Sequence, residues 1–380
     1  MTTTPENDST SPPTAPADVA AVAAVAEVAE VLAPDAARAE KKVAKKTAAK
    51  TEGQRTEHAA SEKIAAVIFN PTKVDLPLLR AAVAAAEKTA GWRETLWFET
   101  SKEDPGQKVA AEVLTHDVDV IMIAGGDGTV RAVVEGMRGS DVPVGLIPRG
   151  TGNLLARNLK LTLDSLDRAV STAFAGKDRS IDLGMVEVER EDATKEKFVF
   201  LVMAGLGLDA QMIANTDPDL KQKVGWIAYV DAIRKSLRGN NSINIRYNLD
   251  RQGNHTVRVH TVMIGNCGSL PGNILLLPDA AVDDGVFDIV ALRPEGFFGW
   301  VQIWVKIVWE NGVLRRSQVG RKLMGMTSEV RTLRYLQGRE FVMRLDRPEE
   351  FEVDGDSFGK VVAIKATVEH LGLTVKVPAK

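Results

Sequence analysis

Short apolar runs alternate with helical patterns between residues 64 and 148, and this alternation limits the possible folds more than any other feature of the chain. Ile64–Phe69 is a continuous apolar run that ends at Asn70-Pro71, as expected of a buried parallel strand followed by a turn. Helical spacing follows over residues 76–90 and ends at Gly91. The pattern predicts a doubly wound α/β domain. Its further elements are expected as strands at 94–98, 118–124 and 142–147 and as helices at 106–115 and 129–137.

The segments on either side of this domain differ from it in composition. Residues 1–62 are rich in Ala, Thr, Pro, Glu and Lys, so they are predicted to be a disordered tail. We interpret the lysine cluster at 41–50 as part of a solvated linker, with attraction to anionic lipid or nucleic acid as the alternative. After residue 181 strand-like segments dominate, which predicts a mainly antiparallel β-sandwich. The expected domains are 63–181 and 182–366, with the active site in the cleft between them, and 367–380 as a strand that packs back on the first domain.

Charge and cysteine content exclude several classes of protein. The formal net charge is −3, so no global field attracts the chain to nucleic acid, and specific nucleic-acid binding is not expected. The single cysteine, Cys267, excludes a disulfide framework and suits a reducing cytoplasm. No apolar run approaches the roughly 20 residues that a membrane-spanning helix needs, so no transmembrane segment is expected. The oligomeric state stays open.

The first motif with chemical content is Gly125-Gly126-Asp127-Gly128-Thr129, which lies between a buried strand and a helix. Ligands of open α/β sheets bind at this edge, and glycines let the backbone approach a phosphate. A carboxylate in the same loop makes sense if a magnesium ion lies between it and the phosphate. We therefore interpret Asp127 as a metal-linked residue at a nucleotide triphosphate, against a simple glycine turn as the alternative.

A second glycine-rich turn, Pro148-Arg149-Gly150-Thr151-Gly152-Asn153, follows the next strand and begins the next helix. Two such turns on adjacent strands predict one phosphate cradle at the carboxyl edge of the sheet. The pair matches neither a Walker loop nor the GxGxxG dinucleotide motif. Because the lysine of the Walker loop is missing, phosphate contacts are expected from the backbone, Thr129, Thr151 and metal.

These motifs resemble the diacylglycerol and sphingosine kinase superfamily. The similarity runs from about Ile64 to Val377 and includes Asn70-Pro71, GGDGT at 125–129 and PRGTGNLLAR at 148–157. It continues in order through 276–280, Asp283-Asp284-Gly285 and 353–356. The resemblance implies an α/β nucleotide domain, a β-sandwich domain, and transfer of phosphate from ATP with magnesium to a lipid hydroxyl. An enzyme of this kind is expected in the cytoplasm, peripherally associated with the inner face of the membrane.

The resemblance also implies roles for individual residues. Asp284 matches a magnesium ligand, with the carbonyls of Ala281 and Val286 as companions. Asp354 and Asp356 match the element that holds the proton acceptor. The positions that match nucleotide contacts are Asn70, Pro71, Thr100, Gly125, Gly126, Asp127, Gly128, Thr129, Gly150, Thr151, Gly152 and Asn153.

Three departures from the family pattern affect these expectations. Asp356 replaces the usual Glu and is one methylene shorter, so Asp354 is the stronger candidate for the base. Leu154 replaces an Asp that many members carry. The Asn70-Pro71 turn lacks the usual glycine, and Lys73 is interpreted as an exposed loop lysine, with phosphate contact as the alternative.

A tryptophan-rich segment at 297–309 is the candidate membrane contact. On a helix, Trp300 and Trp304 would share one face, and basic residues follow at 315–322. Packing of the same helix on the sandwich is the alternative. Two rival functions stay open: an NAD kinase, although the chain has no Asn-Glu pair, and a non-catalytic nucleotide-dependent lipid-binding protein. The acceptor lipid also stays open.

Overall fold

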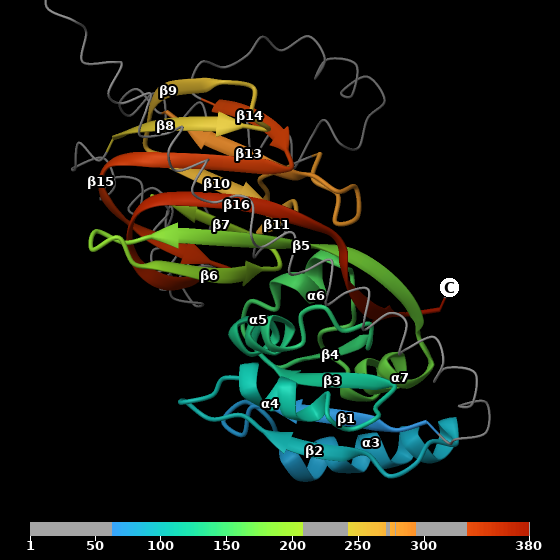
Figure 1. The fold of residues 1–380 in the computed structure, drawn as a ribbon. Coiled ribbons are helices and arrows are strands. Elements are labelled where there is room, and N and C mark those ends of the chain that lie inside the picture. Colours follow the sequence, from blue (N-terminus) through green and yellow to red (C-terminus); the bar gives the residue numbers. More distant parts are fainter. Residues whose placement is uncertain (1–62, 208–241, 271–273, 278, 294–332, 380) are drawn as a thin grey trace, which may run out of the picture. The chain divides into compact units, whose positions relative to one another are not determined.

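The computed structural model describes residues 63–207, 242–270, 274–277, 279–293 and 333–379 (Figure 1). These residues belong to one compact unit that begins at Glu62. The expectations for the tail at 1–62 and for Trp300 and Trp304 lie outside the described residues. Within the described ranges, no helix is long and apolar enough to cross a membrane.

The first part of the unit is a parallel sheet with helices on both faces, as predicted (Figure 1). Its strands pair in the order β2-β1-β3-β4. Alternate residues of β3 enter different clusters: Val120 packs with α3 and α7, and Ile121 packs with α4 and α5. The elements are β1 (Ala65–Phe69), α3 (Leu76–Ala90), β2 (Leu96–Glu99), α4 (Gln107–Val113), β3 (Val120–Gly125), α5 (Asp127–Gly136), β4 (Val144–Pro148), α6 (Leu154–Asn158) and α7 (Leu166–Ala175).

Local sequence explains why the helix α3 begins and ends where the pattern predicts. The Asp75 side chain accepts a hydrogen bond from the Leu78 N–H, which satisfies one of the free donors of the first turn. Gly91 ends the helix with a φ of 70°, a left-handed conformation that glycine adopts without steric cost. The predicted boundaries at 76 and 90 are therefore confirmed.

The second part is antiparallel and rich in β-strands, as predicted. Its core is a separate cluster that includes Phe200, Phe287, Phe341 and Phe351. The long strands β15 and β16 pair with different partners along their lengths, so the antiparallel region is one hydrogen-bonded network. The strands are β5 (Lys177–Glu189), β6 (Lys195–Phe200), β7 (Met203–Leu206), β8 (Ile243–Leu249), β9 (Asn254–Val259), β10 (Thr261–Gly265), β11 (Ser269–Leu270), β12 (Ile274–Leu275), β13 (Phe287–Leu292), β14 (Leu333–Gly338), β15 (Glu340–Val353) and β16 (Asp356–Val377).

Two features of β16 bring the antiparallel region to the parallel sheet. Near its end, Val375 pairs in parallel with Val144 of β4, so the chain's last strand extends the first sheet. At its start, a two-residue turn joins it to β15, because Val353 pairs directly with Asp356. Asp354 and Gly355 of this turn have φ values of 50° and 92°, as in the Asp-Gly turns typical of tight hairpins.

Candidate active site

The loops that follow the four parallel strands lie side by side at the carboxyl edge of the sheet. The Asn70 N–H, just after β1, donates to the Ala124 carbonyl near the end of β3. The Thr100 N–H, just after β2, donates to the Phe69 carbonyl. The Arg149 N–H, just after β4, donates to the Gly125 carbonyl. Segments far apart in the sequence therefore form one continuous edge, where ligands of open α/β sheets bind.

The two glycine-rich loops touch each other through their backbones. A Cβ added to Gly150 would lie 2.8 Å from the Gly126 Cα, a separation that real side chains do not tolerate. The Asn153 side chain holds the second loop closed, since its Oδ1 accepts the Gly150 N–H at 2.9 Å and its Nδ2 donates to the Gly150 carbonyl at 2.8 Å. Glycine is therefore required at position 150, and no side chain from Gly126 or Gly150 lies between the two loops.

Asp127 joins the two loops. Its Oδ1 accepts the Leu154 N–H at 2.5 Å, and its Oδ2 would lie 2.7 Å from a Cβ added to Gly152. Burial raises the pKa of the Asp127 carboxyl above its ordinary value and the nearby Asp356 carboxylate raises it further, whereas N–H donors from Leu154 and Asn153 oppose the shift. Asp127 thus ties the second loop to the first turn of α5.

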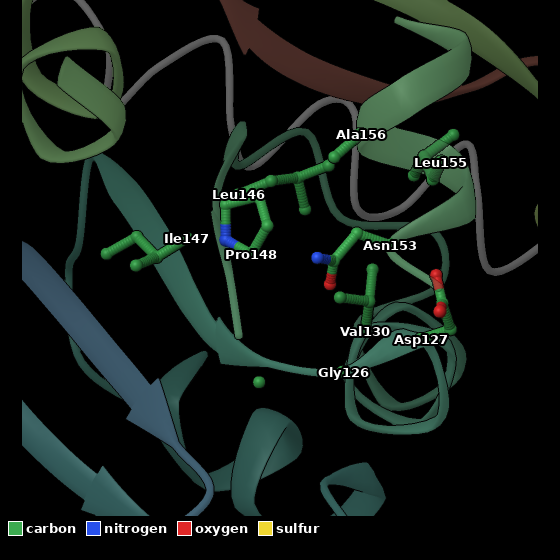
Figure 2. Close-up of a pocket in the computed structure, with 10 residues that line it drawn as sticks. Gly126, Asp127, Val130, Leu146, Ile147, Pro148, Asn153, Leu155 and Ala156 are labelled. Atoms are coloured by element: carbon green, nitrogen blue, oxygen red, sulfur yellow. The ribbon is translucent and has the colours of Figure 1, made fainter. Parts of the chain in front are cut away.

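A small pocket lies between these loops. Figure 2 shows Asp127, from the start of α5, and Asn153, from the loop after β4, lining the same pocket. Its apolar walls include Val130, Leu146 and Ile147. The N-terminus of α5 lies at the Gly126–Asp127 end of this pocket without a side-chain cap, and a helix N-terminus favours an anion.

The other predicted nucleotide residues take less direct positions. Thr129 is buried with its side chain over Gly125, where a Cβ would lie only 2.7 Å from the Thr129 Cβ. The Asn70 side chain accepts hydrogen bonds from the N–H and hydroxyl of Thr72. Thr100 is buried and its hydroxyl donates to the Phe69 carbonyl at 3.3 Å. Their side chains stabilise the loops; Pro71 and Thr151 are exposed, as is Lys73.

Asp354 lies beneath the hairpin turn and not at its surface. Its carboxylate accepts N–H groups from Leu201 at 2.9 Å, Val202 at 2.8 Å and Met203 at 3.0 Å. Burial raises the pKa of Asp354 to about 6, while these three donors and Arg131 act in the opposite direction. The carboxylate therefore anchors the hairpin to the chain between β6 and β7.

The raised pKa of Asp354 predicts a pH-dependent stability. The folded protein binds the proton of Asp354 more tightly than the unfolded chain does, so the stabilisation is present below the ordinary pKa of 3.8 and is lost as pH rises through about 6. We expect the difference in unfolding free energy between wild type and Asp354→Asn to shrink by up to about 3 kcal/mol from pH 4 to pH 7.5. Urea denaturation at the two pH values measures it. Asp141→Asn, at an exposed position, is the control, and a difference that is constant or grows with pH would contradict the expectation.

Asp356 lies beside the first glycine loop. Its side chain is 55% exposed, and its Oδ2 would lie 3.0 Å from a Cβ added to Gly128. The Arg131 guanidinium of α5 donates to the same oxygen at 3.4 Å. In spite of its short side chain, Asp356 is therefore the carboxylate of the hairpin that reaches the loop, whereas both oxygens of Asp354 are occupied by backbone donors. This geometry favours Asp356 over Asp354 as proton acceptor.

The turn that carries the predicted magnesium ligands has a donor set that fits this ion. Asp284 is exposed, and its Oδ1 accepts the Val286 N–H at 3.2 Å. Burial raises the pKa of nearby Asp288, and the carboxylates of Asp284 and Asp279 add to the shift. Carboxylate and carbonyl oxygens are the ligands that magnesium prefers. Across the described ranges no three His, Cys, Asp or Glu side chains gather around one point, so the carbonyls of Ala281 and Val286, together with water, would complete the shell.

Asp182 and Arg131 are among the described buried charged residues that sequence reasoning missed. Asp182 is fully buried on β5, and its carboxylate accepts N–H groups from Gly285 and Leu371, each at 2.7 Å, so it holds the Asp284 turn in place. Arg131 is 8% exposed on α5. The signal for Asp182 was a lone carboxylate in an apolar strand segment; Arg131 offered none, because a single arginine on a helix is ordinary.

Comparison with known proteins shows which sequences this chain resembles. Residues 64–186 match the family model described as the diacylglycerol kinase catalytic domain. A diacylglycerol kinase of Staphylococcus carnosus (strain TM300) is 29% identical over 61% of this chain and 73% of its own length. That of Bacillus subtilis (strain 168) is 27% identical over 63% of this chain and 77% of its own length. These matches support the diacylglycerol kinase superfamily for this chain. The family model and the names of the relatives likewise support an enzyme of the lipid kinase class.

Solved structures support the fold. A crystal structure of a diacylglycerol kinase from Bacillus anthracis str. Sterne superposes with a TM-score of 0.56 at 17% identity and covers 83% of this chain and 96% of its own. A second structure from the same organism gives a TM-score of 0.61 at 21% identity, over 84% of this chain and 97% of its own. At these identities the likeness concerns the fold, which confirms the predicted combination of an α/β domain with an antiparallel β-rich region.

Proposed function

We propose that this lipid kinase transfers the γ-phosphate of ATP, with magnesium, to the hydroxyl of a membrane lipid. The observation that carries the proposal is the position of the Asp356 carboxylate beside Gly128, at the start of the helix that would receive the phosphates. A proton acceptor and an anion site within reach of one another are what in-line phosphate transfer to an alcohol needs.

The phosphate groups would be bound mainly by backbone. The first turn of α5 offers free N–H groups, and Gly126 and Gly150 keep side chains away from that turn. The exposed Thr151 hydroxyl can donate to a phosphate oxygen. Asn70 and Thr100 would stabilise the neighbouring loops and shape the nucleotide site.

Magnesium would be held by Asp284 and the carbonyls of Ala281 and Val286, with Asp127 linked to the ion through the nucleotide. When bound, the ion neutralises charge that develops on the phosphate oxygens. Asp182 would keep the Asp284 turn in position through its hydrogen bond to the Gly285 N–H.

Asp356 would act as general base. As the lipid hydroxyl oxygen attacks the γ-phosphorus, its proton passes to the Asp356 carboxylate, the bond from phosphorus to the bridging oxygen breaks, and ADP leaves. Asp354 would support the hairpin that presents Asp356. We propose that the enzyme meets its acceptor at the inner face of the membrane, with Trp300 and Trp304 as contacts.

The experiment is phosphate transfer from γ-labelled ATP with magnesium to vesicles that contain diacylglycerol, a sphingoid base or a polyprenol, with NAD in a parallel reaction. A labelled lipid product supports the proposal and identifies the acceptor. Label in NADP alone would replace it with an NAD kinase, and ATP binding without any product would favour a non-catalytic lipid-binding protein.

A further inference from the structure

Arg131 is a buried cation in the middle of the candidate site. It lies one helical turn after Gly128 on α5 and is 8% exposed. Its guanidinium stacks 4.5 Å from the centre of the Phe358 ring and donates to the Asp356 Oδ2 at 3.4 Å. Its positive charge also lowers the pKa values of the Asp354 and Glu135 carboxyls, against the larger effect of their burial. Arg131 thus interacts electrostatically both with the carboxylates of the hairpin and with the carboxylate of Glu135 on its own helix.

The face of α5 that carries Arg131 contacts the antiparallel region at several points. Arg131 and Glu135 lie about one turn apart on one face of α5, and Arg138 follows in the turn just after the helix ends at Gly136. Glu135 accepts an N–H from Val199, and the Arg138 Nε donates to Glu369 of β16 at 2.8 Å. These contacts link α5 and the turn that follows it to β6 and β16 of the antiparallel region. Arg131 differs from Glu135 and Arg138 because it contacts the candidate base, in addition to Glu135, whose Oε2 lies 3.9 Å from the Arg131 Nη1.

The contact between Arg131 and Asp356 is better suited to orienting the Asp356 carboxylate than to stabilising the folded protein. A distance of 3.4 Å is long for a charge-assisted hydrogen bond, and a half-exposed ion pair contributes little to folding. Within the described part of the chain, the Asp356 carboxylate has no other hydrogen bond. The Phe358 ring stacks on the guanidinium plane and limits its rotation. The planar guanidinium of an arginine allows this stacking, whereas the ammonium group of a lysine does not.

We propose that Arg131 is a positioning residue that holds the Asp356 carboxylate at the start of α5, where it can accept the proton of the lipid hydroxyl. The inference rests on the proposed function and adds the group that orients its base. A carboxylate on a hairpin without such a partner samples several rotamers, and only a fraction of them reach the acceptor.

The test compares Arg131→Gln with Arg138→Gln, which removes the ion pair to Glu369 just after the end of the same helix without touching the base. For Arg131→Gln we expect kcat to fall roughly 10- to 100-fold with the KM for ATP within about twofold, because orientation is lost and nucleotide contacts remain. Arg138→Gln is expected to keep kcat within about twofold. If Arg131→Gln does not fold, Arg131→Met, whose apolar side chain suits the Phe358 ring, takes its place with the same expectation.

A double-variant cycle separates positioning from an independent role. Since Arg131 acts through Asp356, adding Arg131→Gln to Asp356→Asn should cause no further loss in kcat. An unchanged kcat in Arg131→Gln, a rise in the KM for ATP alone, or a multiplied loss in the double variant would each overturn the proposal. Wild-type enzyme without any labelled lipid product would instead overturn the proposed function, so the two failures can be distinguished.

Discussion

Asp356→Asn is expected to lower phosphate transfer about 100- to 10,000-fold while ATP still binds, the range typical for loss of a general base. The amide has nearly the same shape as the carboxylate but cannot accept the proton of the acceptor hydroxyl. Asp356 is exposed and takes no part in the hydrogen bonds that hold the two glycine loops, so the fold and the ATP site should be preserved. The measurement is single-turnover transfer of labelled phosphate, together with the Kd for ATP and the Tm.

Two variants of the same hairpin control this prediction. Ser357→Ala removes an exposed hydroxyl that donates to Glu350, next to the proposed base, and is expected to keep full activity. Asp354→Asn leaves Asp356 in place. It should lower the free energy of unfolding more than the rate of phosphate transfer, since three backbone donors lose a carboxylate partner. If folded Asp354→Asn loses transfer while Asp356→Asn keeps it, the base is Asp354.

Asp127→Ala is expected to lower kcat/KM for ATP by roughly 100-fold or more. The variant removes the acceptor of the Leu154 N–H, and a hydrogen bond to a charged group contributes about 1.5–3 kcal/mol. The second glycine loop would then no longer be tied to α5, and the proposed magnesium link would be lost as well. Asp141→Ala, on the exposed loop before β4, serves as the control and should behave like wild type.

Asp127→Asn distinguishes the two roles of this carboxyl. Asparagine keeps an oxygen that can accept the Leu154 N–H but carries no charge for a metal-bound nucleotide. We therefore expect near-normal ATP affinity with a turnover as low as that of Asp127→Ala. Full turnover in Asp127→Asn would contradict the metal-linked role, and full turnover in Asp127→Ala would contradict both roles.

Local sequence was sufficient for the α/β part and for its glycine loops. A fully apolar strand such as Ile64–Phe69 can only be buried, and the Asp75 and Gly91 caps are local signals, so the alternation of strands and helices and the loops between them follow from short-range patterns. The Asp-Gly turn at 354 was equally local. The antiparallel region was predicted as a class, but the route of β15 and β16 between several partners was not, because long strands choose their partners by packing over large sequence distances.

The positions of the carboxylates were decided by tertiary structure. In sequence, Asp354 and Asp356 are equivalent members of one short motif, and the shorter side chain argued against Asp356. Folding buries Asp354 under three N–H groups from residues about 150 positions away and turns Asp356 toward Gly128. Arg131 gains its importance in the same way, since its partner is 225 residues distant. Residue types near a glycine loop determine that phosphate chemistry is available, but only the packing of distant strands determines which carboxylate is desolvated and which one reaches the site.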